Sequence, residues 1–188
     1  MFRRMFRAAA LDSDFYDRAE HEPSLNREAF AVVLIASTFA AVGAWIGYDD
    51  AVGPGLSEAI RGWLGIGSLM TPSHGGFLVV IATNIVVGVV GWIVWAATTT
   101  VVGTRVFGGT TDFGEMSRVL GYAQAPRVIA VVPLLGPVAG VWTLVASVIA
   151  IRQGLDFDTP RAVGSAIGGW LVWMLVQFGV SIIGASLF

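Results

Sequence analysis

The fold of this chain is decided by the stretch TDFGEMSRVLGYAQAPRVIAVVPLLGPVAGVWTLVASVIAIR, residues 111–152. It contains two apolar runs, which are separated by the proline- and glycine-containing turn at residues 133–137. Proline removes a backbone hydrogen bond and kinks or ends a helix. The pattern therefore predicts two short apolar helices that fold back on each other. Arg127 is the one arginine that falls inside a hydrophobic segment.

The composition around this stretch is that of a membrane protein. Of the 188 residues, 55% are hydrophobic and 13% are charged, whereas soluble domains have about 25% charged residues. A soluble domain of this size has too small an interior to hide so much apolar surface. The apolar residues also form long uncharged blocks, which is typical of membrane-spanning helices.

Several kinds of site are excluded or disfavoured by composition. There is no cysteine, which excludes disulfides and thiolate metal sites. The net charge of −2 gives no basic field for nucleic acid. His21 and His74 lie far apart in polar regions, so we expect no metal site and no cofactor.

We predict an all-α, polytopic membrane helical bundle with five transmembrane helices, at residues 29–47, 77–102, 116–132, 138–151 and 162–188. The third helix is expected to be kinked at Pro126 and joined to the fourth by a tight Pro/Gly turn. Asp112 and Glu115 match a capping box that opens the third segment. Asn84 and Gln177 are expected to make contacts between helices.

Residues 1–28 form a polar leader, which we expect in the cytoplasm, ahead of a single transmembrane domain at residues 29–188. Arg3, Arg4 and Arg7 alternate with apolar residues in its first part. Two interpretations stay open: a short amphipathic helix on the inner leaflet, or an unstructured tail whose arginines only set topology. In the loop at residues 48–76, Pro54 suits the start of a further interfacial helix.

The positions of the arginines predict the topology, because positive residues near spans prefer the cytoplasm. Five spans with a cytoplasmic N-terminus place nine arginines inside and Arg61 alone outside, with Arg127 within a span. Four spans, with residues 116–126 at the surface, give eight inside and three outside. The count favours five spans with the C-terminus outside.

Several short motifs resemble those of a known family. They are Val119-Leu120-Gly121-Tyr122 followed by Pro126, then Pro133 and Gly136, then Val141-Trp142 in a span ending at Ile151-Arg152, with Gly154-Leu155 and Pro160-Arg161-Ala162 beyond. Over about the last 80 residues the chain resembles the Yip family of Ypt/Rab-GTPase-interacting, five-span membrane proteins. Gly154-Leu155 and Pro160-Arg161-Ala162 resemble the loop and the start of the last helix in prokaryotic members, whereas the acidic, tyrosine-containing leader motif of eukaryotic members is missing.

The resemblance implies five spans and a role in membrane organisation or trafficking-like processes, without a settled activity for prokaryotic members. It gives Gly121, Tyr122, Pro126, Pro133, Gly136 and Trp142 as motif residues with structural roles. The charge count reaches the same number of spans independently.

No catalytic set is visible, since serine, histidine and carboxylate side chains do not converge and Gly108-Gly109 lacks the lysine of a phosphate loop. We therefore expect no enzyme. One polar cluster stands out: Glu115, Arg118, Tyr122, Gln124 and Arg127. Glu115 with Arg118, and Gln124 with Arg127, are three residues apart and able to pair on a helix.

Two interpretations of this cluster stay open. Ionisable groups in a membrane usually face protein or water, so the cluster suits a pocket for a lipid headgroup or substrate at the kink. Alternatively it is structural, with Arg127 bonded to freed carbonyls or extended to water.

The leading hypothesis is a non-enzymatic, multi-pass cell-membrane protein that binds membrane proteins or anionic lipid headgroups, with self-association left open. The rival is a small transporter or channel that uses the broken third helix.

Overall fold

The computed structural model describes residues 1–49 and 77–172, and in these ranges the chain is all-α without a strand. The elements, in chain order, are α1 (Phe2–Ala9), α2 (Ser13–Glu20), the 3₁₀ helix η1 (Pro23–Leu25), α3 (Asn26–Asp49), α5 (Phe77–Arg105), α6 (Phe113–Tyr122), the 3₁₀ helices η2 (Ala125–Val131) and η3 (Pro133–Leu135), α7 (Gly136–Gly154), and the described part of a last helix at residues 159–172. The predicted interfacial helix after Pro54 and the predicted contact of Gln177 lie outside these residues.

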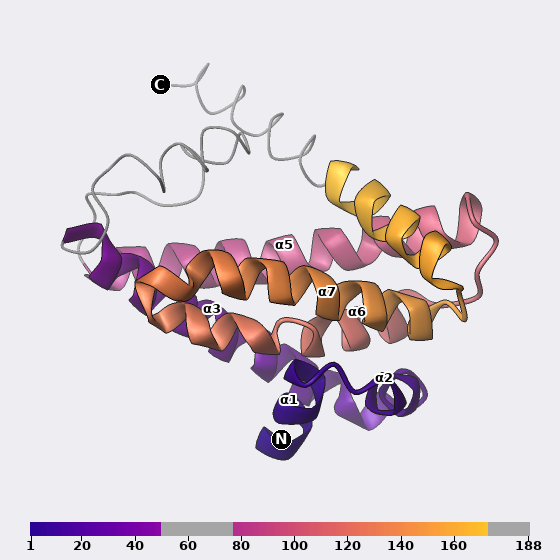
Figure 1. Ribbon diagram of the computed structural model, residues 1–188, viewed down its shortest axis with the longest axis horizontal. Helices are drawn as coiled ribbons and strands as arrows, with labels where there is room; N and C mark the ends of the chain where they lie inside the picture. Colours follow the sequence, from indigo (N-terminus) through magenta and orange to yellow (C-terminus); the bar gives the residue numbers. More distant parts are fainter. Residues whose placement is uncertain (50–76, 173–188) are drawn as a thin grey trace.

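The long helices form a bundle. Figure 1 shows α3, α5 and α7 side by side along the long axis, with α1 and α2 against one side of them. The path through α6 and η2 runs along the bundle in one direction, and α7 returns in the other. η2 packs between α3 and α7, while α6 packs against α3 and α5.

Three described helices are long and apolar enough to cross a membrane: Pro23–Ile46, Asn84–Arg105 and Gly136–Gly154. They agree with the predicted first, second and fourth spans. Their large apolar side chains are widely exposed, as at Val90 (52%) in α5 and Val141 (64%) in α7. In water such surfaces would favour aggregation, whereas a hydrocarbon layer accommodates them.

The predicted third helix is not one kinked helix. Residues 116–132 divide into α6, which ends at Tyr122, and η2, with Pro126 near its start. Proline has no N–H to donate to the carbonyl four residues back. The backbone therefore changes to bonds over three residues, with the Arg127 N–H donating to the Gln124 carbonyl at 3.0 Å. The turn at Pro133–Leu135 then leads directly into α7, as expected from its proline and glycine.

The prediction for the start of this segment is confirmed. The Asp112 carboxylate accepts from the Glu115 N–H at 2.9 Å, and the Glu115 carboxylate accepts from the Asp112 N–H at 3.1 Å. This is a complete capping box. It begins α6 at Phe113, three residues before the predicted start of the span.

The leader is folded, so the alternative of an unstructured tail is wrong. Both α1 and α2 are helical, and the Asp12 carboxylate caps α2 by accepting from the Phe15 N–H at 3.1 Å. Ala8 and Tyr16 are fully buried, and the Tyr16 hydroxyl donates to the Ala8 carbonyl at 3.1 Å. The leader helices thus belong to the same core as the rest of the chain.

The densest part of that core surrounds α6. The α6 side chains of Met116, Val119, Leu120 and Tyr122 are fully buried. They are enclosed by leader residues, the start of α3 and the end of α7. Burial of such residues is the main favourable term in folding, so α6 anchors the leader to the bundle.

Candidate functional site

The residues of the predicted polar cluster take different roles in the structure. Glu115 is used by the capping box, where its carboxylate also accepts from the Thr111 hydroxyl at 3.3 Å. It does not receive Arg118, although the two are one helical turn apart. Glu115 therefore serves the start of α6.

Arg118 points into the leader instead. Its side chain is 3% exposed. Its Nε donates to Asn26 Oδ1 at 2.7 Å, and its Nη1 donates to the Ala19 carbonyl at 3.1 Å and also to the Glu20 carbonyl. These carbonyls end α2, where the helix dipole is negative and backbone acceptors lack helical partners. Arg118 therefore joins the C-terminus of α2 and the N-terminus of α3 to α6.

Tyr122, one turn further along α6, makes a second polar link. Its hydroxyl donates to Glu28 Oε2 at 3.0 Å, and its ring contacts the Phe15 ring edge-on with centroids 4.9 Å apart. The other Glu28 oxygen accepts from Arg4 Nη1 at 2.8 Å. Glu28 thereby connects α1, α3 and α6. We call Arg4, Asn26, Glu28, Arg118 and Tyr122 the leader network.

Gln124 and Arg127 form a separate pair. Arg127 Nη1 donates to Gln124 Oε1 at 3.2 Å, and Gln124 is 4% exposed. Both lie at or after the end of α6. The predicted cluster is thus divided into the capping residue Glu115, the leader network and this pair.

Glu20 is a further buried acid that sequence reasoning did not single out. It is 7% exposed and its Oε1 lies 3.3 Å from His21 Nδ1. Burial raises the pKa of the Glu20 carboxyl to about 7, with His21 lowering it and Asp156 raising it. Its Oε2 has no hydrogen-bond partner among the described residues.

Glu28 and Asn26 were likewise assigned no role from the sequence. The one available signal was their polarity at the start of an otherwise apolar span. Their partners on α6 lie more than ninety residues away in sequence, and no local pattern predicts such a pairing.

Two of the motif residues have clear structural roles. A Cβ atom at Gly121 would lie 3.0 Å from Ala29 Cβ and 3.2 Å from the Ala29 carbonyl oxygen, so glycine allows α6 to approach α3 closely. Trp142 Nε1 donates to the Ala9 carbonyl at 2.8 Å, which ties α7 to the end of α1. Among the other motif residues, Pro126 lies in η2, and Pro133 and Gly136 begin η3 and α7.

The polar side chains of the leader network bond to one another and to backbone carbonyls. In residues 1–49 and 77–172, no group of three or more histidine or acidic side chains is placed to hold a metal ion. The polar atoms of the leader network are used in holding helices together. The chemistry of the site is therefore that of a structural clamp.

The structure is an all-α bundle with exposed apolar helices of membrane length, and polar contacts hold the leader against one side of it. These features define the class of polytopic membrane proteins. The sequence matches the Yip1 domain over residues 11–181, and the chain belongs to the Yip1 domain family. Comparison with curated proteins and with solved structures gives no match.

Proposed function

We propose that this protein is a non-enzymatic, multi-pass cell-membrane protein that organises other membrane proteins or anionic lipids through its leader. The observation that carries the proposal is the leader network, which fixes two polar helices rigidly onto the α6 core. A leader held by Arg118 and Glu28 presents a defined surface beside the membrane. Membership of the Yip1 domain family supports a role within a membrane.

The proposed topology has five spans, with a cytoplasmic leader and the C-terminus outside. The arginine count favours it, and the three membrane-length helices occupy three of the five positions. In this topology α6 begins near the cytoplasmic surface under the leader, and α6, η2 and η3 together make the third crossing. The prokaryotic-type resemblance is part of the same proposal.

Site-specific photocrosslinking in native membranes tests the proposed role. Photoreactive residues at the exposed positions Asp14 and Asp17 on α2 are expected to capture a reproducible set of membrane proteins or lipids. Ala19, fully buried on the same helix, is the matched control and is expected to give only intramolecular links. Arg118→Gln is expected to remove the captured set by releasing α2.

Absence of any adduct at Asp14 and Asp17 beyond those at Ala19 contradicts the organising role. Turnover of a substrate by the purified protein, with loss on Arg127→Ala, contradicts the non-enzymatic assignment.

The rival function, a small transporter or channel, is favoured by η2. A stretch of 3₁₀ helix between longer helices is a common hinge, and broken helices line many transporter sites. Flux measurements in liposomes with panels of ions and solutes separate the two proposals. Flux that depends on Arg127 supports the rival, and its absence across the panel counts against it.

A further inference from the structure

The outward face of α1 is unusually apolar for a leader helix. Phe2 is 73% exposed and Phe6 is 76% exposed. Residues four apart lie on the same helix face, so the two rings form one outward ridge. On the opposite face Ala8 is fully buried and Met5 packs against the core. The protein uses one side of α1 for its own packing and leaves the phenylalanine side uncovered.

The arginines of α1 are divided in the same way. Arg4 is committed to Glu28, and Arg7 Nε donates to Asp12 Oδ2 at 2.6 Å. Arg3 is exposed and makes no ion pair with any residue in the described ranges. α1 contains no acidic residue. A free cation beside an exposed apolar ridge suits a surface that combines phosphate groups with hydrocarbon.

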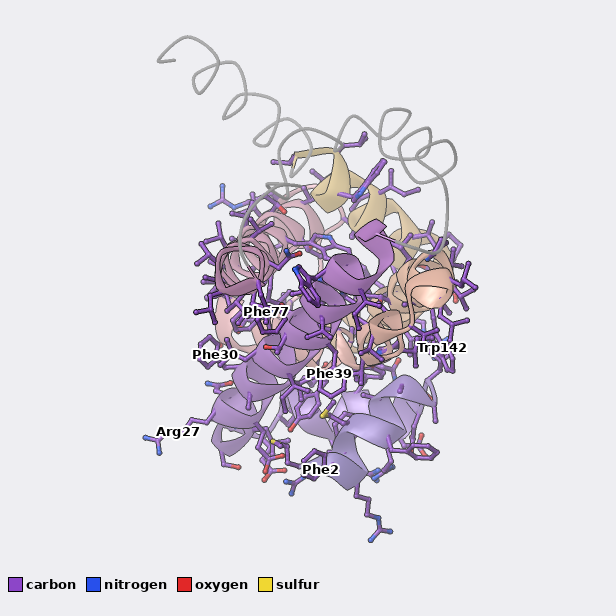
Figure 2. All side chains as sticks on the ribbon, turned by 90° about the vertical axis from the view of Figure 1, so that its left-hand side faces the viewer. Phe2, Arg27, Phe30, Phe39, Phe77 and Trp142 are labelled. Carbon is purple, nitrogen blue, oxygen red and sulfur yellow. The ribbon has the colours of Figure 1, made fainter. Side chains whose placement is uncertain are left out.

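The position of α1 brings this ridge to the lipid-facing exterior of the bundle. The bond from Trp142 Nε1 to the Ala9 carbonyl places the end of α1 against α7. There Leu11 borders an apolar groove lined by Pro137, Val138, Val141, Trp142 and Val145 of α7. Figure 1 shows α1 beside the bundle, and Figure 2 shows Phe2 and Trp142 at the periphery of the molecule. The exposed surface of α1 thus continues into that of a membrane-length helix.

We propose that α1 is an interfacial helix that lies in the leaflet on the arginine-rich side of the membrane. Phe2 and Phe6 insert between acyl chains, and the Arg3 guanidinium binds the phosphates of anionic phospholipids. This inference rests on the membrane placement of α3, α5 and α7 proposed above. It gives a defined helix for lipid contact to the leader through which the protein is proposed to organise other membrane components.

The absence of cysteine from the chain makes a direct test possible with single nitroxide labels. Phe2→Cys, Phe6→Cys, Val90→Cys and Asp14→Cys are each labelled in the full chain, reconstituted in phosphatidylcholine–phosphatidylglycerol nanodiscs. All four positions are exposed, so the substitutions leave the core intact. Collision with oxygen reports contact with hydrocarbon, and collision with a water-soluble nickel chelate reports contact with water.

Labels at Phe2 and Phe6 are expected to have an oxygen-to-nickel collision ratio several-fold above that at Asp14 and close to that at Val90. Ratios at Phe2 and Phe6 equal to that at Asp14 overturn the proposal. Shielding of these labels from both reagents also overturns it, because a protein partner or a second copy then covers α1. If Val90 itself collides freely with nickel, the membrane placement of the bundle fails, and that failure is distinct from failure of α1 alone.

The role of Arg3 is tested by lipid composition. The depth of the Phe6 label is compared in phosphatidylcholine alone and in the mixture with phosphatidylglycerol. Insertion is expected to be deeper in the mixture, and Arg3→Gln is expected to abolish the difference. Arg18→Gln, the same charge change at an exposed site on α2, is expected to preserve it. Equal depth in both lipids with Arg3 intact, or equal loss with either variant, contradicts the phosphate contact.

Discussion

Around α6, methionine, valine, leucine and tyrosine side chains are fully buried, whereas along the first half of α7 valine, leucine and tryptophan side chains face outward. The two regions have similar apolar content but different neighbours. The leader helices and the end of α7 enclose α6. The start of α7 lacks such a cover in the described structure, and its exposed side chains suit contact with lipid.

The comparison shows that hydrophobicity alone does not distinguish a segment buried by protein from one buried by lipid. What differs is the polar chemistry at the boundary. Around α6 the charged groups are matched to specific acceptors, as Arg118 is to the carbonyls that end α2. Along α7 the one exposed indole N–H is satisfied by the leader. The leader therefore lies at the boundary between the region buried by protein, around α6, and the region exposed to lipid, along the start of α7.

Replacing Arg118 is expected to have the largest effect on this boundary. Arg118→Met removes the Arg118 donor from the Ala19 and Glu20 carbonyls and from the Asn26 amide oxygen, of which the Ala19 carbonyl keeps the Glu22 N–H at 3.3 Å. A hydrogen bond from a charged donor contributes about 1.5 to 3 kcal/mol, and the loss of these three is expected to cost about 4 kcal/mol. This destabilisation is measured as a loss in the free energy of unfolding in detergent and as faster proteolysis within residues 1–25. Arg18→Met, on the exposed side of α2, is the control, and equal proteolysis of both variants would argue against the clamp.

The second prediction concerns the part of the bundle away from the leader, where α3 and η2 approach closely. A Cβ at Gly43 would collide with the carbonyl of Ala130. Because backbone atoms block the new methyl group, Gly43→Ala is expected to destabilise the protein by about 3 kcal/mol. Gly140→Ala is the matched control, since nothing lies within 4 Å of a Cβ there. Thermal unfolding in detergent distinguishes the two, and an equal midpoint would contradict the close contact.

The third prediction tests pH dependence at the leader end. Burial raises the pKa of Glu20 to about 7 from its ordinary value of 4.5, so the folded state holds its proton more tightly than the unfolded state. The stability contributed by this proton is present below pH 4.5 and is lost as the pH rises towards 7. The charge of His21 lowers the pKa of Glu20, whereas the charges of Asp156, Asp17 and Glu115 raise it.

Glu20→Gln removes that titration and is expected to raise stability above pH 7 by on the order of 2 kcal/mol. Unfolding midpoints measured from pH 4 to 8 check it against Glu22→Gln, an exposed acid nearby. If the unfolding midpoint of Glu20→Gln changed with pH as steeply as that of the wild-type protein, burial would not be holding the proton on Glu20.

The smallest effect is expected at the contact between the two regions. Trp142→Phe keeps an aromatic ring but loses the donor to the Ala9 carbonyl, at a cost of about 1 kcal/mol. Hydrogen exchange of the α1 amides is expected to quicken. Val141→Ala, at a 64% exposed neighbour, is expected to leave exchange unchanged. If the α1 amides exchanged at the same rate in both variants, the leader network alone would hold α1 in place.

Much of this architecture could be predicted from local pattern. The long apolar blocks gave α3, α5 and α7, and Asp112 with Glu115 gave the start of α6, because these signals depend on residues close in sequence. The resemblance to the family was carried by residues 119–162, and the match to the Yip1 domain confirms it.

The remainder depends on distant contacts. Arg118 was expected beside Glu115, but it binds carbonyls and an amide about ninety residues earlier, because the α2 C-terminus offers buried acceptors that Glu115 does not. Pro126 was expected to kink a helix, but the chain ends α6 before it. The leader was divided from the domain by polarity, although its apolar side chains complete the core.

The 3₁₀ form of η2 also changes how far the chain reaches. Its seven residues advance about 2.0 Å each, compared with about 1.5 Å in an α-helix. They therefore cover about 14 Å, whereas the same residues in α form would cover about 10 Å. Because α6 is packed beneath the leader, η2 has to carry the chain from α6 to the turn at Pro133–Leu135. The longer rise of the 3₁₀ form places this turn further from α6 along the bundle. Rewinding η2 into an α-helix would draw the reversal back by about 4 Å, roughly two-thirds of a helical turn.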